Sequence, residues 1–364
     1  MSKTNRVSCP SPLALFNGSC LGTKPTGLGV VARDLISQLD TGLVHLLDPL
    51  QGNRHGSIQI PKSLMPELGV KAHFRRLVWI QTKIPSLLKK SGAEIFLSPV
   101  PEAPLFRGVR SVVLAHDLLP LRYPQPTPLL AYHLAYVPLV LHRSQRILCN
   151  SKATARELHE RLGLPLKKLI TIPLGFNPNK LYPLQLTREP FFLVLGRHDP
   201  HKNISGILRA IALLRDKETQ LWIIGPQDRR YTPSLKKLAS ELEIDHRCKW
   251  IPWVDDSERL KLLNRCQALV IASHWEGFGL PALEAMACNT PVIASNSGAL
   301  PEVVGDAGLL FDSKDPAALA DAMSMVLSDG LLVRSLCSRA KKQLDIYRWD
   351  NAARTVEEVL KDLC

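Results

Sequence analysis

The feature that most constrains this chain is a repeated alternation between short apolar runs and longer segments with helical periodicity. In the first half, the apolar runs are residues 13–16, 43–47, 94–97, 111–115 and 146–149, and the helical patterns include residues 30–39 and 129–141. In the second half, the runs are residues 191–195, 220–224, 249–251, 268–271, 291–294 and 308–311. Helical patterns lie between them at residues 204–214, 235–242, 257–264, 281–287 and 317–327. Such alternation is typical of a parallel sheet covered by helices, so we predict an α/β fold.

The length of the chain indicates two domains. At 364 residues it is too long for one ordinary core and suits two domains of about 150 to 200 residues each. Pro178 and Pro183 lie in a polar segment, residues 177–190, that is typical of a linker. We predict an N-terminal domain over residues 1–185 and a C-terminal domain over residues 186–364, both doubly wound and Rossmann-like. They are expected to face each other across a cleft, with ligands at the carboxyl ends of the strands. The amphipathic last segment, residues 349–363, is a candidate to pack back on the N-terminal domain.

Composition excludes several classes of protein. The chain is 45% hydrophobic and 22% charged, which is typical of a globular protein. No run approaches the roughly 20 apolar residues that span a bilayer. Residues 1–16 lack the apolar stretch and cleavage site of a signal peptide. The eight cysteines form no C-x-x-C pair, so neither a zinc site nor a redox motif is indicated. We expect a cytoplasmic protein with reduced thiols and no metal.

Charge is distributed unevenly along the chain. Residues 1–185 hold 23 Lys and Arg against 9 Asp and Glu, a balance of +14, whereas residues 186–364 hold 23 against 24, a balance of −1. Such an asymmetry indicates an anionic partner for the first half: a membrane surface, nucleic acid or a phosphorylated substrate. A generically basic surface is the simpler interpretation. Only charge favours nucleic acid, because aromatic residues make up 6% of the chain and no known nucleic-acid-binding motif is present.

Two glutamates, Glu276 and Glu284, flank a glycine-rich turn in the stretch HWEGFGLPALEAMA, residues 274–287. The pattern predicts that Glu276 lies in the loop after strand 268–271 and that Glu284 lies one turn into the next helix. A glycosidase needs two carboxyl groups about 5 to 9.5 Å apart, whereas eight helical residues span roughly 12 Å. We therefore expect the two carboxylates to contact different parts of one extended ligand. The unpaired N–H groups at the start of this helix suit a phosphate.

Two cations follow a strand in the stretch FFLVLGRHDPHKN, residues 191–203. Arg197 and Lys202 lie in the predicted loop, and Asn203 is expected to cap the next helix. Permanent positive charges at a strand's carboxyl end suit a diphosphate and could neutralise the charge that develops as it leaves. Taken by itself, this segment is more typical of two solvated loop cations. A Gly- and Ser-rich turn followed by Glu302 adds a third strand–turn–helix unit over residues 295–316.

The first half carries two shorter motifs. Gly27 and Gly29 open a helix in TGLGVVARDL, residues 26–35, and Asp48 falls 21 positions after Gly27, as in a dinucleotide-binding fingerprint. In that fold the glycines follow the first strand in a tight turn. Here about ten residues separate Phe16 from Gly27, which argues against a nicotinamide-dependent oxidoreductase. His116 begins HDLLPLRYP, residues 116–124, directly after a predicted strand. A lone histidine is more often structural, but the strand end and the adjacent carboxylate make this one a candidate site residue.

These motifs resemble those of family 4 retaining glycosyltransferases, which have the GT-B fold. The resemblance lies in GRHDPHKN, HWEGFGLPALEAMACNTPVIAS and SGALPEVVGDAGLLFD, in that order and spacing, and in the two motifs of the first half. It implies that Glu276 faces the donor sugar and that Glu284 holds the ribose hydroxyls. It also implies that Arg197 and Lys202 stabilise the diphosphate leaving group, and that His116 lies beside the transferred sugar.

The resemblance extends to the loops around the donor. Backbone N–H groups of residues 278–280 would meet the sugar or phosphate, and the segment around Val254 would lie near the base. This segment has Pro252-Trp253 where relatives usually carry a glycine, which departs from the family's pattern for base recognition. The expected catalytic residues are His116, Glu276, Arg197 and Lys202. The residues expected to contact the nucleotide sugar are Gly27, Gly29, Arg197, Lys202, Val254, Gly277, Phe278, Gly279, Leu280 and Glu284.

The expected function is retaining transfer of a hexose from a nucleotide diphosphate sugar to a hydroxyl of a glycan or lipid-linked acceptor. The first-half motifs most resemble those of family members that use GDP-mannose, which makes it the favoured donor with UDP-sugars as alternatives; the resemblance implies neither a cofactor nor a metal. A sugar-nucleotide epimerase of the same fold and a non-catalytic sugar-nucleotide-binding protein are the alternatives. A cytoplasmic location is expected, with peripheral binding to the inner membrane face through the basic first half and no nucleic-acid partner.

Overall fold

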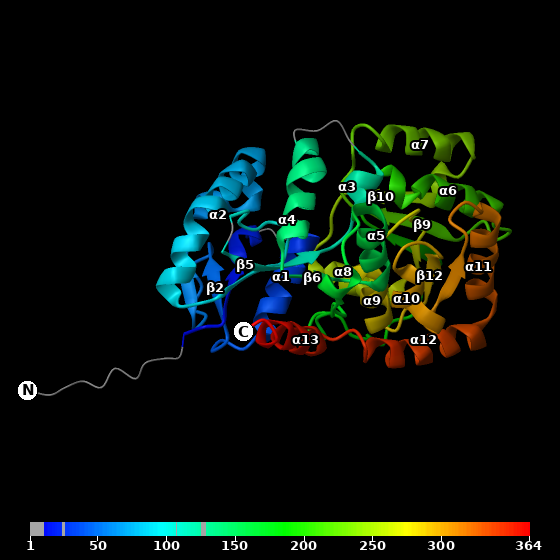
Figure 1. Ribbon diagram of the computed structural model, residues 1–364. Helices are drawn as coiled ribbons and strands as arrows, with labels where there is room; N and C mark the ends of the chain where they lie inside the picture. Colours follow the sequence, from blue (N-terminus) through cyan, green and yellow to red (C-terminus); the bar gives the residue numbers. More distant parts are fainter. Residues whose placement is uncertain (1–10, 24–25, 107, 125–128) are drawn as a thin grey trace, which may run out of the picture. The chain divides into compact units, whose positions relative to one another are not determined.

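The computed structural model describes residues 11–23, 26–106, 108–124 and 129–364 (Figure 1). The interpretation of the N-terminus as lacking a signal peptide, and Cys9 with it, falls largely on residues 1–10, which lie outside the described residues. The chain forms two compact units. The first holds the described residues up to Asn150 together with Thr154–Leu174 and Trp349–Cys364; the second holds Ser151–Ala153 and Gly175–Arg348.

The first unit is built on seven parallel strands in the order β3-β2-β1-β4-β5-β6-β7. The strands are β1 (Ala14–Asn17), β2 (Val44–Asp48), β3 (Ser57–Gln59), β4 (Ile95–Ser98), β5 (Arg110–Ala115), β6 (Arg146–Cys149) and β7 (Leu169–Thr171). The helices are α1 (Gly27–Gln38), α2 (Gly69–Ser91), α3 (Leu119–Arg122), α4 (Val137–Arg143), α5 (Lys152–Leu162) and α13 (Trp349–Lys361). A π-helical turn, Tyr132–Tyr136, leads into α4.

The second unit is built on six parallel strands in the order β10-β9-β8-β11-β12-β13. The strands are β8 (Phe191–Leu195), β9 (Gln220–Ile224), β10 (Cys248–Ile251), β11 (Leu269–Ile271), β12 (Val292–Ser295) and β13 (Leu309–Phe311). The helices are α6 (Ile204–Leu213), α7 (Thr232–Glu241), α8 (Asp256–Arg265), α9 (Leu280–Ala287), α10 (Leu300–Val304), α11 (Pro316–Ser328) and α12 (Gly330–Leu344).

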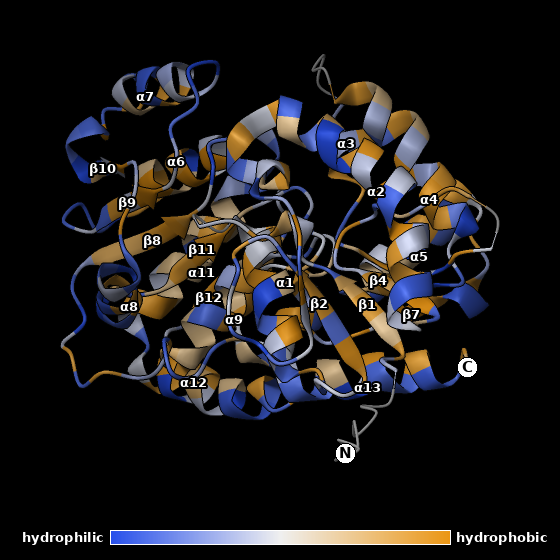
Figure 2. Ribbon diagram, turned by 90° about the vertical axis from the view of Figure 1, so that its left-hand side faces the viewer, coloured by the Kyte–Doolittle hydropathy of each residue, from blue (hydrophilic) through white to orange (hydrophobic). Residues whose placement is uncertain are grey.

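The core of the second unit shows how the sequence produces these layers. Strands β8 and β9 are largely apolar, as buried strands should be, and Figure 2 draws them mostly orange. Helix α6 places Ile204, Ile207 and Ile211 on one face, where they pack with strand residues in a single buried cluster. Asn203 caps this helix as predicted, with its side-chain oxygen accepting from the Gly206 N–H at 3.1 Å. The predicted α/β architecture with two Rossmann-like sheets is confirmed.

Both sheets reverse their strand order at one point. In the first unit the switch lies between β1 and β4, and in the second it lies between β8 and β11. Connections leave such a pair of neighbouring strands toward opposite faces, which opens a crevice at their carboxyl ends where ligands bind. The two switch points therefore identify the loops in which site residues should be sought.

Most predicted elements lie within one or two residues of the observed ones, and the differences have physical reasons. The strands β3 and β7 were not predicted, because each has only three residues, none of them buried, and lies at a sheet edge. The long helix α2, Gly69–Ser91, was not singled out either; its mean hydropathy is low and Pro85 lies within it. The predicted helix 129–141 corresponds to the π-helical turn followed by α4.

The boundary between units lies earlier than the predicted one at residues 185/186. The compact division falls after Leu174 because the next segment packs on α8. Lys180 pairs with Asp256 at 2.8 Å, and the Leu184 N–H donates to the Asn264 side chain at 2.6 Å. The final helix α13 groups with the first unit, where Glu357 accepts from the Asp40 N–H at 2.9 Å.

No single helix in the described ranges is long and apolar enough to cross a membrane; the helices Pro316–Ser328 and Gly330–Lys361 pass that test only together, as a pair bent by 99°.

A buried ion pair fastens α2 to the loop after β4. The Arg76 guanidinium donates to both carboxylate oxygens of Glu102, at 2.7 and 2.8 Å, and the two residues are only 6% and 2% exposed. Removing one member of such a pair leaves a buried charge without compensation, which typically costs about 3 to 5 kcal/mol.

We predict that Glu102→Gln lowers the calorimetric transition of the first unit by roughly 6 °C or more. The matched control is Glu94→Gln, because Glu94 pairs with Arg110 at 3.1 Å with both side chains about half exposed. Its effect should stay within about 1 kcal/mol. Equal shifts of the transition temperature in the two variants would show that the buried Arg76–Glu102 pair does not stabilise the first unit more than an exposed pair does.

Candidate active site

The switch point of the second sheet holds an ion pair between two predicted site residues. Lys202 lies in the loop after β8 and Glu276 in the loop after β11, the two strands that flank the switch. The Lys202 Nζ donates to the Glu276 Oε1 at 2.6 Å, across 74 positions of sequence. The two side chains are 26% and 11% exposed. The structure thus brings together the cation and the carboxylate that the motifs had placed separately.

Glu276 is held in place by its neighbours on three loops. The Ser273 hydroxyl donates to its Oε1 at 2.6 Å, and its backbone carbonyl accepts from the Ala299 N–H at 2.9 Å. Gly298 has φ +61°, and a Cβ there would lie 2.3 Å from the Glu276 carbonyl oxygen. Only glycine fits this left-handed, closely packed position. The glycine- and serine-rich turn after β12 therefore serves to fix the glutamate.

The charge of Glu276 is stabilised where it lies. Burial raises its pKa, but the Lys202 charge and the hydrogen bonds from Lys202 and Ser273 outweigh burial and leave the pKa below its ordinary value. The carboxylate is ionised at neutral pH and is an acceptor only. Such a group can orient hydroxyls of a ligand, and it is not a proton donor.

Arg197 does not join this ion pair. Its Nε lies 3.3 Å from Asp199, and its side chain is 63% exposed. The loop that carries it begins where β8 and β9 touch, since a Cβ on Gly225 would fall 1.8 Å from the Gly196 carbonyl oxygen. The two predicted cations thus differ in position. Lys202 is partly buried at the switch point, whereas Arg197, five residues earlier in the chain, is exposed on the surface.

Glu284 lies on α9, as predicted, and has a partner that the sequence analysis missed. Arg259 of α8 donates to its two carboxylate oxygens at 3.0 and 3.2 Å. Burial raises the pKa of Glu284, Arg259 lowers it and Asp256 raises it, with a net increase. Arg259 falls within a predicted helix, but no motif or spacing links it to a glutamate 25 positions later. Only the three-dimensional packing of α8 on α9 shows the contact.

The turn between the two glutamates is fixed from both sides. Gly279 has φ +100° and precedes α9, with Pro281 at its second position. The Phe278 ring is buried and packs edge-on against Tyr347 with a centroid separation of 5.7 Å. The Gly277 carbonyl accepts from the Ser151 hydroxyl at 2.7 Å. The Phe278 side chain is therefore structural. Ligand binding by the backbone N–H groups of residues 277–280, which include Leu280, stays a prediction.

The loop after β10 was expected near the nucleotide base. Val254 is half-buried there, and the adjacent Trp253 is 73% exposed, although indole rings are usually covered. An exposed aromatic face at the carboxyl end of a strand offers a stacking surface for a planar ring. Recognition of the base by this loop stays a prediction.

The glycine-rich loop of the first unit begins α1 beyond the end of β1. Thr26 caps the helix, with its hydroxyl accepting from the Gly29 N–H at 3.4 Å. No atom lies within 4 Å of the position that a Cβ on Gly27 would take. The fold itself does not require glycine at position 27, which leaves room for a ligand to approach the backbone.

His116 follows β5 and has a defined orientation. Its Nε2 lies 2.8 Å from the Pro99 carbonyl, which can only accept, so Nε2 carries the proton and Nδ1 is left as an acceptor. Burial lowers its pKa to about 4, against a smaller opposing effect of the Pro99 hydrogen bond. The imidazole is neutral at physiological pH. It can accept a hydroxyl proton in a hydrogen bond, and it carries no charge to offer a phosphate.

The contacts of Asp48 test whether the first unit binds a dinucleotide, as the oxidoreductase interpretation requires. In a dinucleotide-binding fold the corresponding carboxylate holds the ribose. Here the two oxygens of Asp48 accept from the N–H groups of Leu50 and Gly52, at 2.8 and 2.6 Å, and the residue is 3% exposed. The carboxylate stabilises its own turn, which argues against a ribose-binding role. Within the described ranges, no group of three or more His, Cys, Asp or Glu side chains is arranged to hold a metal ion.

Two doubly wound parallel units have the architecture of the GT-B fold. Family models bear this out: the model described as Glycosyl transferases group 1 matches residues 183–343, and that described as Glycosyltransferase Family 4 matches residues 25–180. The chain belongs to glycosyltransferase family 4, and it is a glycosyltransferase of the group 1 type.

Relatives in this family act on different molecules. The chain is 29% identical to O-antigen chain mannosyltransferase B of Escherichia coli over 260 residues, 66% of this chain and 68% of the relative. It is 28% identical to a D-inositol 3-phosphate glycosyltransferase of Acidothermus cellulolyticus over 247 residues, 61% of this chain and 54% of that one. The crystal structure of Anabaena Alr3699/HepE in complex with UDP and glucose has a TM-score of 0.76, with 17% identity and coverage of 96% and 99% of the two chains, and shows the same fold.

We predict that Gly298→Ala lowers sugar transfer at least tenfold, because the new Cβ displaces the backbone of Glu276. The matched control is Gly163→Ala: Gly163 has a similar φ of +64°, but nothing lies within 4 Å of its Cβ position. Both variants should lose about 1 to 2 kcal/mol of stability from left-handed strain, and Gly298→Ala should lose more because its Cβ also overlaps the Glu276 backbone. Activity assays should separate them, and an unaffected Gly298→Ala enzyme would contradict the positioning role.

We predict that His116 titrates near pH 4 rather than near its ordinary pKa of 6.5. Between those values the unfolded chain binds a proton that the folded protein does not, so His116 costs stability as pH falls through this window. Thermal melts of wild type and His116→Asn should therefore converge as pH falls from 6.5 toward 4. Histidine NMR spectra check the site directly; a titration near pH 6.5 with a proton on Nδ1 would contradict the assignment.

Proposed function

We propose that the protein transfers a hexose, with mannose favoured, from a nucleotide diphosphate sugar to a hydroxyl of a glycan or lipid-linked acceptor, with retention at the anomeric carbon. The observation that carries this proposal is the Lys202–Glu276 ion pair at the switch point of the second sheet. It provides a cation for the diphosphate and an ionised acceptor for sugar hydroxyls at one place.

In the proposed reaction, the bond between the anomeric carbon and the diphosphate oxygen breaks, and the acceptor oxygen bonds to the same face of that carbon. The acceptor proton passes to the departing diphosphate oxygen. Lys202, with Arg197, stabilises the charge that develops on this leaving group. Glu276 is engaged by Lys202 and Ser273, which suits it to orienting the sugar more than to attacking it.

The remaining residues are assigned to the ends of the donor. His116 accepts a hydrogen bond from a sugar hydroxyl through Nδ1, and its neutral state supports this role. Glu284 binds the ribose hydroxyls, for which it must share or exchange its contact with Arg259. Gly27, Gly29 and the turn at residues 277–280 approach the phosphates through backbone N–H groups. In this proposal no step uses a metal or cofactor.

The donor is the least constrained part of the proposal. GDP-mannose is favoured because the relative named O-antigen chain mannosyltransferase B is similar over most of its length. The UDP-bound fold neighbour and the inositol 3-phosphate glycosyltransferase keep UDP-sugars as the alternative. The basic first half, with its balance of +14, supports action at the cytoplasmic face of an anionic membrane.

Transfer assays on Glu276→Ala and Lys202→Ala test the proposal. Each should lower turnover roughly 100-fold or more, because each removes a group that acts on the sugar or the leaving charge. Lys237→Ala is the matched control, since Lys237 is 77% exposed on α7. Unchanged transfer rates in both site variants would contradict the proposed roles of Glu276 and Lys202. Release of free nucleoside diphosphate and a 2-epimer without acceptor would identify an epimerase instead.

A thermal-shift screen against GDP-, UDP- and ADP-sugars identifies the donor. A ligand that binds only the folded state stabilises it by roughly 2.7 kcal/mol at a hundredfold excess over Kd. We expect the largest rise in Tm with GDP-mannose, and the rise should disappear in Lys202→Ala. A larger rise with a UDP-sugar would reassign the donor. A rise without turnover on any acceptor would indicate a sugar-nucleotide-binding protein.

A further inference from the structure

The loop that carries the two predicted cations, residues 196–203, is attached to the rest of the second unit at two separate places. One attachment lies beside Lys202. The Asn203 side-chain amide donates to the Ala272 carbonyl at 3.2 Å and to the Ser313 carbonyl at 2.8 Å. These two acceptors lie in the loops after β11 and β13. The Lys202 half of the loop is therefore held by the loops on one side of the switch point.

The other half of the loop is attached on the opposite side, through His198. This residue lies between Arg197 and Asp199 and is only 1% exposed. Its Nδ1 lies 2.8 Å from the hydroxyl oxygen of Thr232, the first residue of α7. The same oxygen accepts from the Asp228 N–H, in the loop after β9, at 2.9 Å. One buried hydroxyl thus joins the loop after β8, the loop after β9 and the start of α7.

The contacts of Thr232 also define the state of the imidazole. Because the Thr232 oxygen accepts from the Asp228 N–H, its proton is available for donation to the His198 Nδ1. Burial lowers the pKa of His198, the Lys236 charge lowers it further, and the charges of Asp199 and Asp228 oppose this with a smaller effect. A neutral imidazole with Nδ1 as acceptor fits both observations.

Packing alone does not explain a histidine at position 198. Its Nε2 is buried and has no hydrogen-bond partner in the described structure, and the Trp250 ring packs against it with a centroid separation of 5.4 Å. A buried polar atom without a partner costs stability. A leucine of similar volume would fill the same space without that cost. The feature that only the histidine supplies is the hydrogen bond from Nδ1 to Thr232.

Arg197 is the cation whose position depends on this attachment. Its side chain is 63% exposed and has an ion-pair contact with Asp199 at 3.3 Å. Its charge also acts on Asp228, whose pKa is lowered to about 2 by Arg230 with a smaller contribution from Arg197. Arg197 therefore faces the loop after β9, to which the hydroxyl of Thr232 attaches His198. An exposed side chain on a loop needs such a support to keep one orientation.

We propose that His198 is a positioning residue for the donor: its hydrogen bond to Thr232 holds the Arg197 half of the loop, so that the guanidinium points at the diphosphate of the nucleotide sugar. His198 itself is enclosed and does not touch the ligand. The inference rests on the proposed function, which assigns the diphosphate to Arg197 and Lys202. It adds a residue to which neither the motifs nor the resemblance gave a role.

Calorimetric titration of the full-length protein with GDP and UDP tests this role. His198→Leu should weaken binding of both by about tenfold, the loss expected when one charge-assisted hydrogen bond is no longer held in place. Both nucleotides should be affected, because the contact is with the phosphates and not with the base. Thr232→Val removes the other partner and should weaken binding to the same extent.

His198→Asn is the conservative variant. The oxygen of an asparagine side chain lies where Nδ1 lies in histidine, so it can accept from the Thr232 hydroxyl. Binding of GDP and UDP by this variant should therefore return to within about twofold of wild type. A residue that only fills space in the core would not be replaced better by asparagine than by leucine.

Double-mutant cycles separate the two halves of the loop. If His198 acts through Arg197, the His198→Leu/Arg197→Ala protein should bind GDP no more weakly than Arg197→Ala does. The combination of His198→Leu with Lys202→Ala should instead multiply the two losses, because the Lys202 half has its own attachments.

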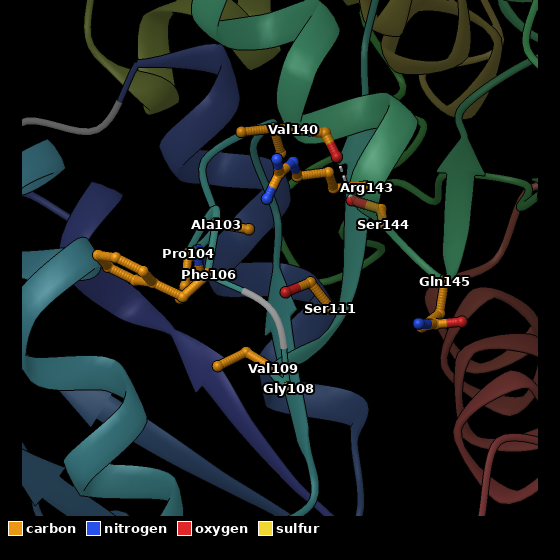
Figure 3. Close-up of a pocket in the computed structure, with 10 residues that line it drawn as sticks. All are labelled: Ala103, Pro104, Phe106, Gly108, Val109, Ser111, Val140, Arg143, Ser144 and Gln145. Atoms are coloured by element: carbon orange, nitrogen blue, oxygen red, sulfur yellow. Dashed lines mark hydrogen bonds between the residues drawn. The ribbon is translucent and has the colours of Figure 1, made fainter.

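Two matched controls lie away from the donor loop. Thr219 is buried like Thr232, and its hydroxyl donates to Asp216 at 2.8 Å, but it precedes β9 at the opposite end of the sheet. Thr219→Val should lower Tm without changing diphosphate binding. Arg143 is an exposed arginine of the first unit, which lines a hollow of about 340 Å³ beside the segment that leads into β5 (Figure 3). Arg143→Ala should leave diphosphate binding unchanged.

Three results would overturn the inference. If His198→Leu binds GDP and UDP as wild type does while Lys202→Ala binds them more weakly, the positioning role fails and the proposed function stands. If His198→Asn loses as much binding as His198→Leu, or if the loss persists when Arg197 is alanine, His198 is an ordinary core residue. If wild type binds neither nucleotide, the inference and the proposed function fail together.

Discussion

The contact between Lys202 and Glu276 is the interaction around which the switch point of the second unit is organised. It joins the loops after the two strands that flank the switch point, and the turn after β12 adds Gly298 beneath the glutamate. Partly buried charges are costly to hold unless they satisfy each other, and these two side chains are 26% and 11% exposed. The two charges neutralise each other, and in the proposed reaction a diphosphate would compete with Glu276 for Lys202. That competition would couple phosphate binding to the release of a carboxylate that then serves the sugar.

The first unit applies the same architecture to a different chemistry. The Asn17 side chain donates to the Ser98 hydroxyl at 3.1 Å across the switch point between β1 and β4, and the loop after β4 begins with Pro99, whose carbonyl orients His116. Here the polar groups are neutral, and the imidazole is kept neutral by burial. In the proposed reaction, the second unit would supply charged groups and the first unit a neutral imidazole, each from residues at strand ends.

Sequence patterns predicted the parts of this structure that depend on local chemistry. Buried strands such as β8 are recognisable as continuous apolar runs, and Asn203 is recognisable as a helix cap. The strand–turn–helix pattern predicts that Glu276 lies in the loop after a strand. What the patterns could not predict depends on packing between distant segments. Arg259 reaches Glu284, and the segment after Leu174 packs on α8, through contacts that no spacing encodes. The short edge strands and the exposed side chains of α2 were not predicted for a related reason. Few of their side chains are buried, so their sequences show no periodic pattern of apolar residues.

The central claim, that Glu276 competes with a diphosphate for Lys202, is tested most directly by calorimetric titration of the Glu276→Gln protein with GDP and UDP. If the claim holds, neutralising Glu276 removes its ion pair with Lys202, and the nucleoside diphosphate binds more tightly than it binds wild type. The Kd should fall roughly tenfold for each 1.4 kcal/mol that the ion pair had cost the binding free energy. Lys202→Met should abolish the gain when combined with Glu276→Gln. A Glu276→Gln protein that binds both diphosphates as wild type does, or more weakly, would contradict the account.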